Sequence, residues 1–118
     1  MKKLLLLFFI FTDLAFAQNV ITLKGLLPCD KWLSARQMST ADYYETAIQG
    51  FINGIATATS IEIWNANGVR MSDEQAYLYI DNYCRKFPLE DAWRAGWALA
   101  NEKTNNALIN QSKKRMKQ

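Results

Sequence analysis

The stretch Asp81-Asn82-Tyr83-Cys84-Arg85-Lys86-Phe87-Pro88-Leu89 organises the fold that this sequence predicts. It contains Cys84, one of two cysteines in the chain, and the other is Cys29. A bond between them would tie the front of the domain to its centre. Pro88 marks the end of one predicted helix and the start of the next, because proline does not continue a helix.

The first 17 residues have the pattern of a secretory signal peptide with cleavage after Ala17. Lysines at positions 2 and 3 precede an apolar core at 4–11, and small residues lie before the cleavage site. The run is too short for a transmembrane helix, which needs about 20 apolar residues. A lipidated Cys29 is disfavoured because this cysteine follows a proline and lies well past the apolar core. We therefore expect an exported, periplasmic protein.

The processed chain is expected to form one domain without a membrane span. It would have 101 residues (118 − 17), and its net charge would fall from +3 to +2 because the signal contains two lysines and one aspartate. Such a balance gives no electrostatic reason to expect nucleic acid binding. We expect a leader over 18–27 of undecided conformation, a helical domain over 28–111, and a basic tail over 112–118.

An exported chain with two cysteines predicts one disulfide bond, Cys29–Cys84. The two positions are 55 residues apart (84 − 29). The chain contains no histidine, so both a metal site and a catalytic cysteine would lack their commonest partner. We expect a structural bond, with no metal and no cofactor.

The spacing of apolar residues predicts an all-α fold, a small bundle of about four helices crosslinked by the disulfide. Apolar side chains recur at steps of three and four, which is typical of amphipathic helices. No strand pair with a hairpin signal is found. The helices are expected over 29–37, 40–64, 72–87 and 89–111.

Local signals refine the predicted helices. Ser72 and Gln75 form a capping-box pattern at the start of the third helix. Gly50 and Gly54 lie four residues apart in the second, which suggests that another helix backbone passes close to them, since glycine otherwise weakens a helix. Residues 57–71 stay undecided, because β-branched residues weaken the helical pattern there.

Two pairs of opposite charges are spaced four residues apart on the predicted third and fourth helices. They are Asp81 with Arg85 and Glu90 with Arg94. On an exposed helix surface each pair would contribute a few tenths of a kcal/mol.

The sequence does not predict an enzyme. Without histidine the commonest general base is absent, and neither a Gly-x-Ser-x-Gly turn nor a phosphate-binding glycine loop occurs. The acidic pairs 73–74 and 90–91 lie at predicted helix starts, where capping explains them.

The aromatic content favours a protein partner. Four tryptophans and five tyrosines are many for this length, and aromatic side chains are enriched at binding hot spots. They also fill small cores, which is the commoner role. Trp97 lies at the edge of the apolar stripe of the last predicted helix, so it is our first candidate for partner binding, with Arg94 and Tyr43 as further surface candidates.

Three motifs give the chain a family resemblance over about residues 29–105. They are Cys-x-x-Trp-Leu-x-x-Arg at 29–36, Gly-Phe-Ile-x-Gly at 50–54 and Tyr-Cys-Arg-x-x-Pro-Leu at 83–89, followed by an alanine-rich helix. In this order they resemble the small periplasmic helical proteins grouped with the Rap/Tai immunity proteins. The layout is also similar to that of the HdeA acid-stress chaperones.

The two resemblances imply different functions. An immunity protein of this kind binds and blocks a toxic cell-wall hydrolase delivered by a type VI secretion system, and such proteins tend to be homodimers. An HdeA-like chaperone, or another envelope protein, is the alternative, and the chaperone would expose an apolar surface in acid. No local motif carries over partner-contacting residues; Cys29 and Cys84 carry over as the bridge.

Overall fold

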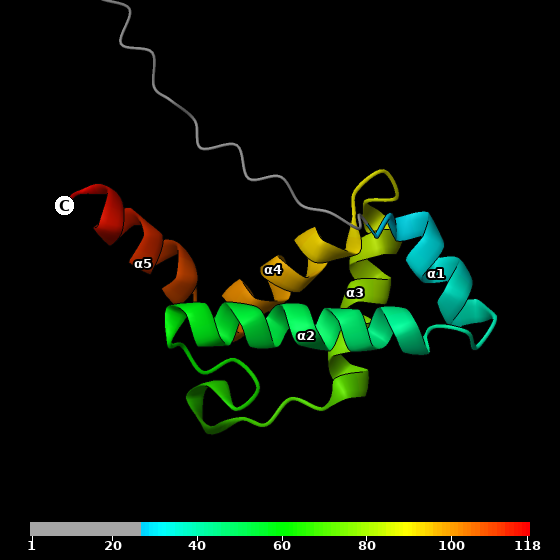
Figure 1. Ribbon diagram of the computed structural model, residues 1–118, viewed down its shortest axis with the longest axis horizontal. Helices are drawn as coiled ribbons and strands as arrows, with labels where there is room; N and C mark the ends of the chain where they lie inside the picture. The colour runs from blue at the N-terminus through cyan, green and yellow to red at the C-terminus, as the bar shows by residue number, and fades with distance from the viewer. Residues whose placement is uncertain (1–26) are drawn as a thin grey trace, which may run out of the picture.

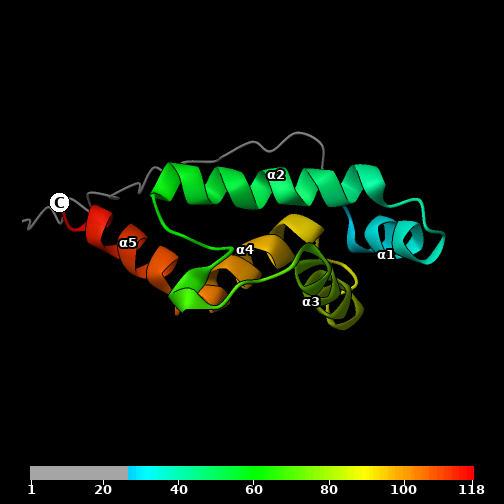
Figure 2. The ribbon, with the colours of Figure 1, turned by 90° about the horizontal axis from the view of Figure 1, so that it is seen from below.

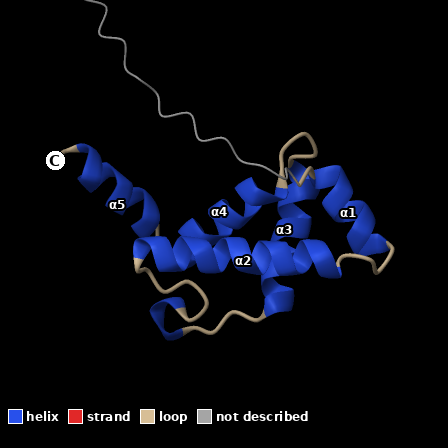
Figure 3. Ribbon diagram, viewed as in Figure 1, coloured by secondary structure: helices blue, strands red, loops and turns tan. Residues whose placement is uncertain are grey.

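The computed structural model describes residues 27–118, which form five α-helices and one short 3₁₀ turn without strands (Figure 3). The predicted signal peptide over 1–17 and residues 18–26 of the predicted leader lie outside the described residues. In chain order the helices are α1 (Cys29–Gln37), α2 (Asp42–Thr59), α3 (Asp73–Lys86), α4 (Ala92–Lys103) and α5 (Ala107–Met116), with the 3₁₀ turn η1 (Ala66–Gly68) between α2 and α3. The all-α expectation is confirmed.

The long helix α2 forms one layer, and α1, α3 and α4 lie on one side of it (Figures 1 and 2). α3 packs against α1 and α4, while α4 packs against α2 and α5. α5 lies at the end opposite α1 in both views. Among residues 27–118, no helix is both long and apolar enough to cross a bilayer.

The core contains large apolar side chains from every one of these helices and from the α2–α3 connection. Burial of such side chains is the main favourable term in folding. The largest fully buried ones are Trp32, Ile48, Ile52, Ile63, Ile80, Leu99, Leu108 and the two cysteines.

The disulfide Cys29–Cys84 is confirmed and joins the first turn of α1 to the last turns of α3. Both cysteines are fully buried. Beside the bond, the backbone of the residues before α1 pairs with the start of α4: Cys29 N donates to Glu90 O at 3.1 Å, and Ala92 N donates to Leu27 O at 2.8 Å. The beginnings of α1 and α4 are therefore fixed together at the end of α3.

The capping box at the start of α3 is also confirmed. The backbone N–H of Gln75 donates to Ser72 Oγ at 3.2 Å, and the backbone N–H of Ser72 donates to Gln75 Oε1 at 2.8 Å. Both donors belong to the group that a helix start leaves without an intrahelical partner.

Two of the predicted helices have wrong bounds. α2 ends at Thr59 instead of 64, because Ser60 adopts a left-handed conformation with φ 56°. The helix expected over 89–111 begins only at Ala92 and is divided into α4 and α5, because Asn105 and Asn106 have φ 51° and 63°. Asparagine is among the few residues that tolerate this region, so the two adjacent asparagines were the available signal for the break.

The expectation of close backbone contact at Gly50 and Gly54 is also wrong. A Cβ added at either would meet nothing within 4 Å, and both residues are exposed. The close approach occurs at Gly96 of α4, where a Cβ would lie 3.2 Å from Cδ1 of Phe51. The absence of a side chain at Gly96 lets the Phe51 ring of α2 lie directly against α4.

Removing the disulfide should lower the free energy of unfolding by about 4 kcal/mol, because the bond restricts a long loop in the unfolded chain. We expect this loss in the double variant Cys29→Ala/Cys84→Ala, measured by urea unfolding. Dithiothreitol should destabilise the wild-type protein similarly and leave the variant unchanged. A loss below about 1 kcal/mol would contradict this estimate.

Candidate functional site

An open hollow of about 550 Å³ lies where α2, α3 and α4 meet. We name it the aromatic groove, because aromatic side chains from all three helices line it. Its lining residues are Phe51, Tyr83, Asp91, Trp93, Arg94, Trp97 and Ala98.

The aromatic rings of the groove are placed by helix geometry. Trp93 and Trp97 are four residues apart, so they lie on the same side of α4. The ring centroids of Phe51 and Trp93 are 5.1 Å apart at an interplanar angle of 55°, a favourable tilted arrangement. This contact joins α2 to α4 and is possible because Gly96 leaves room for Phe51.

Charged side chains mark the end of the groove at the start of α4. Asp91 is the N-cap, and its carboxylate accepts a hydrogen bond from the backbone N–H of Arg94 at 2.9 Å. Arg94 Nε lies 3.1 Å from Glu90 Oε2, so the predicted pair is confirmed. Because an exposed pair of this kind is worth at most about 1 kcal/mol, Arg94 can turn toward a partner at small cost.

The structure brings together two of the three predicted partner-binding residues. Trp97, with 42% of its surface exposed, and Arg94 both line the aromatic groove. Tyr43 is 79% exposed but lines a separate hollow of about 360 Å³ beside the connection between α1 and α2. The candidate surface is therefore the groove, and Tyr43 belongs to another part of the molecule.

Sequence reasoning did not assign Phe51, Tyr83 or Trp93 to this surface. Phe51 and Tyr83 lie on the apolar stripes of their helices, which predicted burial. They are half-buried, because α2 and α3 both approach α4 and leave the edges of the stripes facing the hollow. The pattern on one helix does not indicate where two helices diverge.

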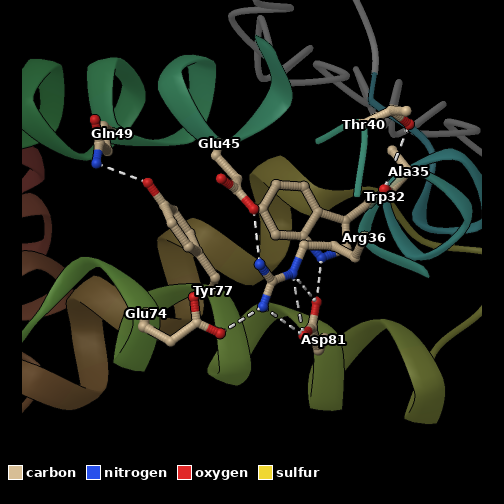
Figure 4. Close-up of polar contacts among 9 residues, drawn as sticks. All are labelled: Trp32, Ala35, Arg36, Thr40, Glu45, Gln49, Glu74, Tyr77 and Asp81. Carbon is tan, nitrogen blue, oxygen red and sulfur yellow. Dashed lines mark hydrogen bonds and ion pairs between the residues drawn. The ribbon is translucent and has the colours of Figure 1, made fainter. Parts of the chain in front are cut away.

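A second cluster, which we name the Arg36 network, joins three helices (Figure 4). Arg36 of α1 lies 2.7 Å from Glu45 Oε1 of α2, 2.8 Å from Glu74 Oε1 of α3 and 3.1 Å from Asp81 Oδ2 of α3. The indole Nε1 of Trp32 donates to Asp81 Oδ1 at 2.7 Å. One guanidinium therefore holds carboxylates of both neighbouring helices.

The predicted pairing of Asp81 with Arg85 is wrong. The Asp81 side chain is only 6% exposed and faces α1, whereas Arg85 is exposed and donates to Asn82 Oδ1 at 3.0 Å. A buried carboxylate needs hydrogen bonds and an opposite charge to offset its desolvation. Trp32 and Arg36 supply both, which an exposed arginine on the same helix would not.

The tyrosine beside the network shows the electrostatic consequences. Burial raises the pKa of Tyr77, and the nearby charges of Asp73 and Glu45 raise it further. The Tyr77 hydroxyl accepts a hydrogen bond from Gln49 Nε2 at 2.7 Å, and the Arg36 guanidinium lies 5.5 Å from the centre of its ring. The phenol is therefore kept neutral as a link between α2 and α3.

Burial lowers the pKa of the Arg36 guanidinium, but its hydrogen bonds to Asp81, Glu74 and Glu45 outweigh this and raise the pKa above the ordinary value. Arg36 thus stays charged and directed at the chain's own carboxylates. Its role is to hold α1, α2 and α3 together, which makes it a support of the fold. Residues 27–118 contain no group of three or more side chains arranged to ligate a metal.

The Arg36 network and the aromatic groove lie on different sides of α3. Asp81 and Cys84 face α1, while Tyr83 lines the aromatic groove. The network and the disulfide fix α3 on one side and thereby position Tyr83 on the other.

No family model, no curated protein and no solved structure matches this chain. The resemblance to Rap/Tai and HdeA proteins therefore stays a prediction from the sequence motifs. What the protein does has to be inferred from its groove and from the chemistry of that groove.

Asp81→Ala should destabilise the protein by about 3 kcal/mol, because it leaves Trp32 and Arg36 without their buried acceptor. The matched control is Glu74→Ala, which removes a carboxylate that is 62% exposed and should cost less than about 1 kcal/mol. Urea unfolding of both variants measures the difference. Equal losses would show that the buried position of Asp81 has no special importance.

Tyr79 of α3 interacts with Glu102 of α4, and we expect this contact to make the protein less stable in alkali. Burial, together with a hydrogen bond to Glu102 and the charge of that carboxylate, raises the pKa of Tyr79 to about 12. Since the unfolded phenol ionises near pH 10, its contribution is fully present below that pH and is lost as the pH rises toward 12. The melting temperature of the Tyr79→Phe variant should fall less steeply over this pH window than that of the wild-type protein. At neutral pH the Tyr79 phenol is protonated in both the folded and the unfolded protein, so the difference between the two melting temperatures there is the reference. Equal slopes in alkali would contradict the assignment.

Proposed function

We propose that this protein is a non-catalytic periplasmic binding protein that holds one protein partner in the aromatic groove. The observation that carries the proposal is the joint placement of Trp97 and Arg94 on that groove. Following the resemblance to Rap/Tai immunity proteins, we further propose that the partner is a secreted cell-wall hydrolase and that binding blocks it.

The chemistry of the groove supports a protein partner. Tryptophan, tyrosine and arginine are the residue types most enriched at binding hot spots. The groove has two tryptophans, one tyrosine and one arginine. An exposed tryptophan offers apolar area to a partner, and the arginine at the rim offers a charge for orientation.

The rigidity of the surroundings supports binding without a large ordering cost. Tyr83 is carried by α3, which is fixed by the disulfide and the Arg36 network. Trp93 and Trp97 lie on α4. The Asp91 side chain caps the start of this helix, and the backbone hydrogen bond from Ala92 to Leu27 holds it in place. A preorganised surface loses little conformational entropy on binding. The disulfide also supports export, since such bonds persist in oxidising compartments.

The test is a pull-down with the exported, oxidised protein in periplasmic and secreted extracts at neutral pH. We expect one stoichiometric partner that stays bound through washing. With that partner purified, Trp97→Ala should weaken binding about 30-fold, as truncation of a hot-spot tryptophan costs about 2 kcal/mol. Arg94→Ala should also weaken it.

Tyr43→Ala is the matched control, because it removes an exposed aromatic ring away from the groove. It should leave affinity within about threefold of wild type. If Tyr43→Ala weakens binding and Trp97→Ala does not, the partner uses the other hollow and the groove assignment is wrong. A separate assay tests the immunity role. If the captured partner is a cell-wall hydrolase, adding this protein should inhibit its activity.

The acid-stress chaperone is the second candidate, and the Arg36 network is the observation that favours it. α1 is held to α2 and α3 by ion pairs of Arg36 with the carboxylates of Glu45, Glu74 and Asp81, and interactions of this kind are the ones that acid denaturation generally removes. Capture of many clients at about pH 3, with none at neutral pH, would support this candidate and contradict the inhibitor.

A further inference from the structure

The last helix, α5, projects from the end of the molecule opposite α1 (Figures 1 and 2). Its contact with the rest of the chain is made by its first turns. Leu108 is buried, and Gln111 Nε2 donates to the backbone oxygen of Thr59 at the end of α2 at 3.0 Å. From residue 112 onward every side chain of the helix is exposed.

The face of α5 directed away from the bundle combines apolar and basic side chains. Ile109, Lys113 and Met116 follow one another at four- and three-residue steps, and Lys117 comes directly after the helix. These four positions share one side of the helix. Ile109 and Met116 lie about a quarter-turn from Leu108, and Lys117 lies opposite it. Met116 is 78% exposed, and Ile109 is exposed as well.

The basic charges of this helix have no partner in the described chain. Lys113, Lys114, Arg115 and Lys117 lie within five positions, and no acidic residue follows Glu102. Among residues 27–118, no carboxylate forms an ion pair with any of the four. They therefore concentrate positive potential at one end of the molecule.

The rest of the described chain has the opposite sign. Residues 27–112 contain seven Lys or Arg and ten Asp or Glu, a net charge of −3 (7 − 10), whereas residues 113–118 carry +4. An anionic surface would therefore repel the bundle and attract α5. This separation of charge fixes the orientation in which such a surface can be approached.

We propose that α5 is a contact site for an anionic phospholipid surface, with its outward face on the membrane and the bundle directed away. Basic side chains provide most of the attraction, and Ile109 and Met116 enter the headgroup layer. Interfacial helices combine apolar side chains, which enter the headgroup boundary, with lysine and arginine side chains, which attract anionic lipids. A purely acidic protein partner would use the lysines but gives no role to the two apolar side chains. The contact is peripheral and independent of the aromatic groove.

The test is flotation of the protein, purified after export in oxidised form, with vesicles of phosphatidylglycerol and phosphatidylcholine. We expect it to float with these vesicles at low ionic strength and to stay behind with phosphatidylcholine alone. Raising the salt should release it, because screening shortens the range of exposed charges. Each basic side chain near such a surface raises partitioning about fivefold.

Lys113→Glu/Lys117→Glu should therefore lower partitioning into anionic vesicles at least 25-fold. The matched control is Lys31→Glu/Arg85→Glu, which changes the net charge equally on α1 and α3 and should have less than about a threefold effect. Circular dichroism confirms that both variants are folded. Ile109→Ser/Met116→Ser, which keeps every charge, should reduce binding several-fold while leaving its salt dependence unchanged.

Three results would overturn the proposal. The first is failure of the wild-type protein to float with anionic vesicles at low salt. The second is an equal loss in the α5 variant and its control, which would make binding a matter of net charge. The third is full binding by Ile109→Ser/Met116→Ser together with equal affinity for soluble polyglutamate, which would assign α5 to acidic proteins. None of these results depends on Trp97, so the groove is tested separately.

Discussion

The carboxylate of Asp81 is buried where α1 packs against α3. A charge removed from water is costly unless donors and an opposite charge surround it. Here the donors are the Trp32 indole and the Arg36 guanidinium, both on α1. α1 must therefore pack against α3 in one register, because a shift of one residue along either helix would separate them. The disulfide, one turn further along α3, fixes the same register covalently.

That constraint extends to the aromatic groove through α3 and α4. Tyr83 lies between Asp81 and Cys84 in the sequence and faces the other way. The segment joined to Cys29 pairs with the first residues of α4, so the same end of the molecule also fixes where α4 begins. A surface built between these two helices has little freedom to rearrange. The contacts of α1 with α3 therefore restrict how the helices of the groove can move, whereas α5 lies outside this part of the molecule.

The candidate site was predictable in part, for reasons that differ by residue. Trp97 and Arg94 could be found because a helical pattern shows which positions fall at the edge of an apolar stripe. Phe51 and Tyr83 fall inside their stripes, and their half-exposure arises from the angle at which three helices meet. Tyr43 shows the opposite limit: the sequence predicted its exposure correctly, but exposure alone does not place a residue beside the other candidates.

Several features could be predicted from the sequence because they depend on neighbouring residues or on the number of cysteines. The helical pattern, the Ser72 capping box and the pairing of two cysteines follow from local hydrogen bonding and from having one possible partner. The pairing of Asp81 with Arg36 instead of Arg85 arises only when the helices pack, because it depends on which side of α3 another helix covers. Packing likewise decides that Gly96, and neither Gly50 nor Gly54, receives a neighbouring ring. Such choices rest on the packing of elements distant in sequence, which a one-helix pattern does not encode.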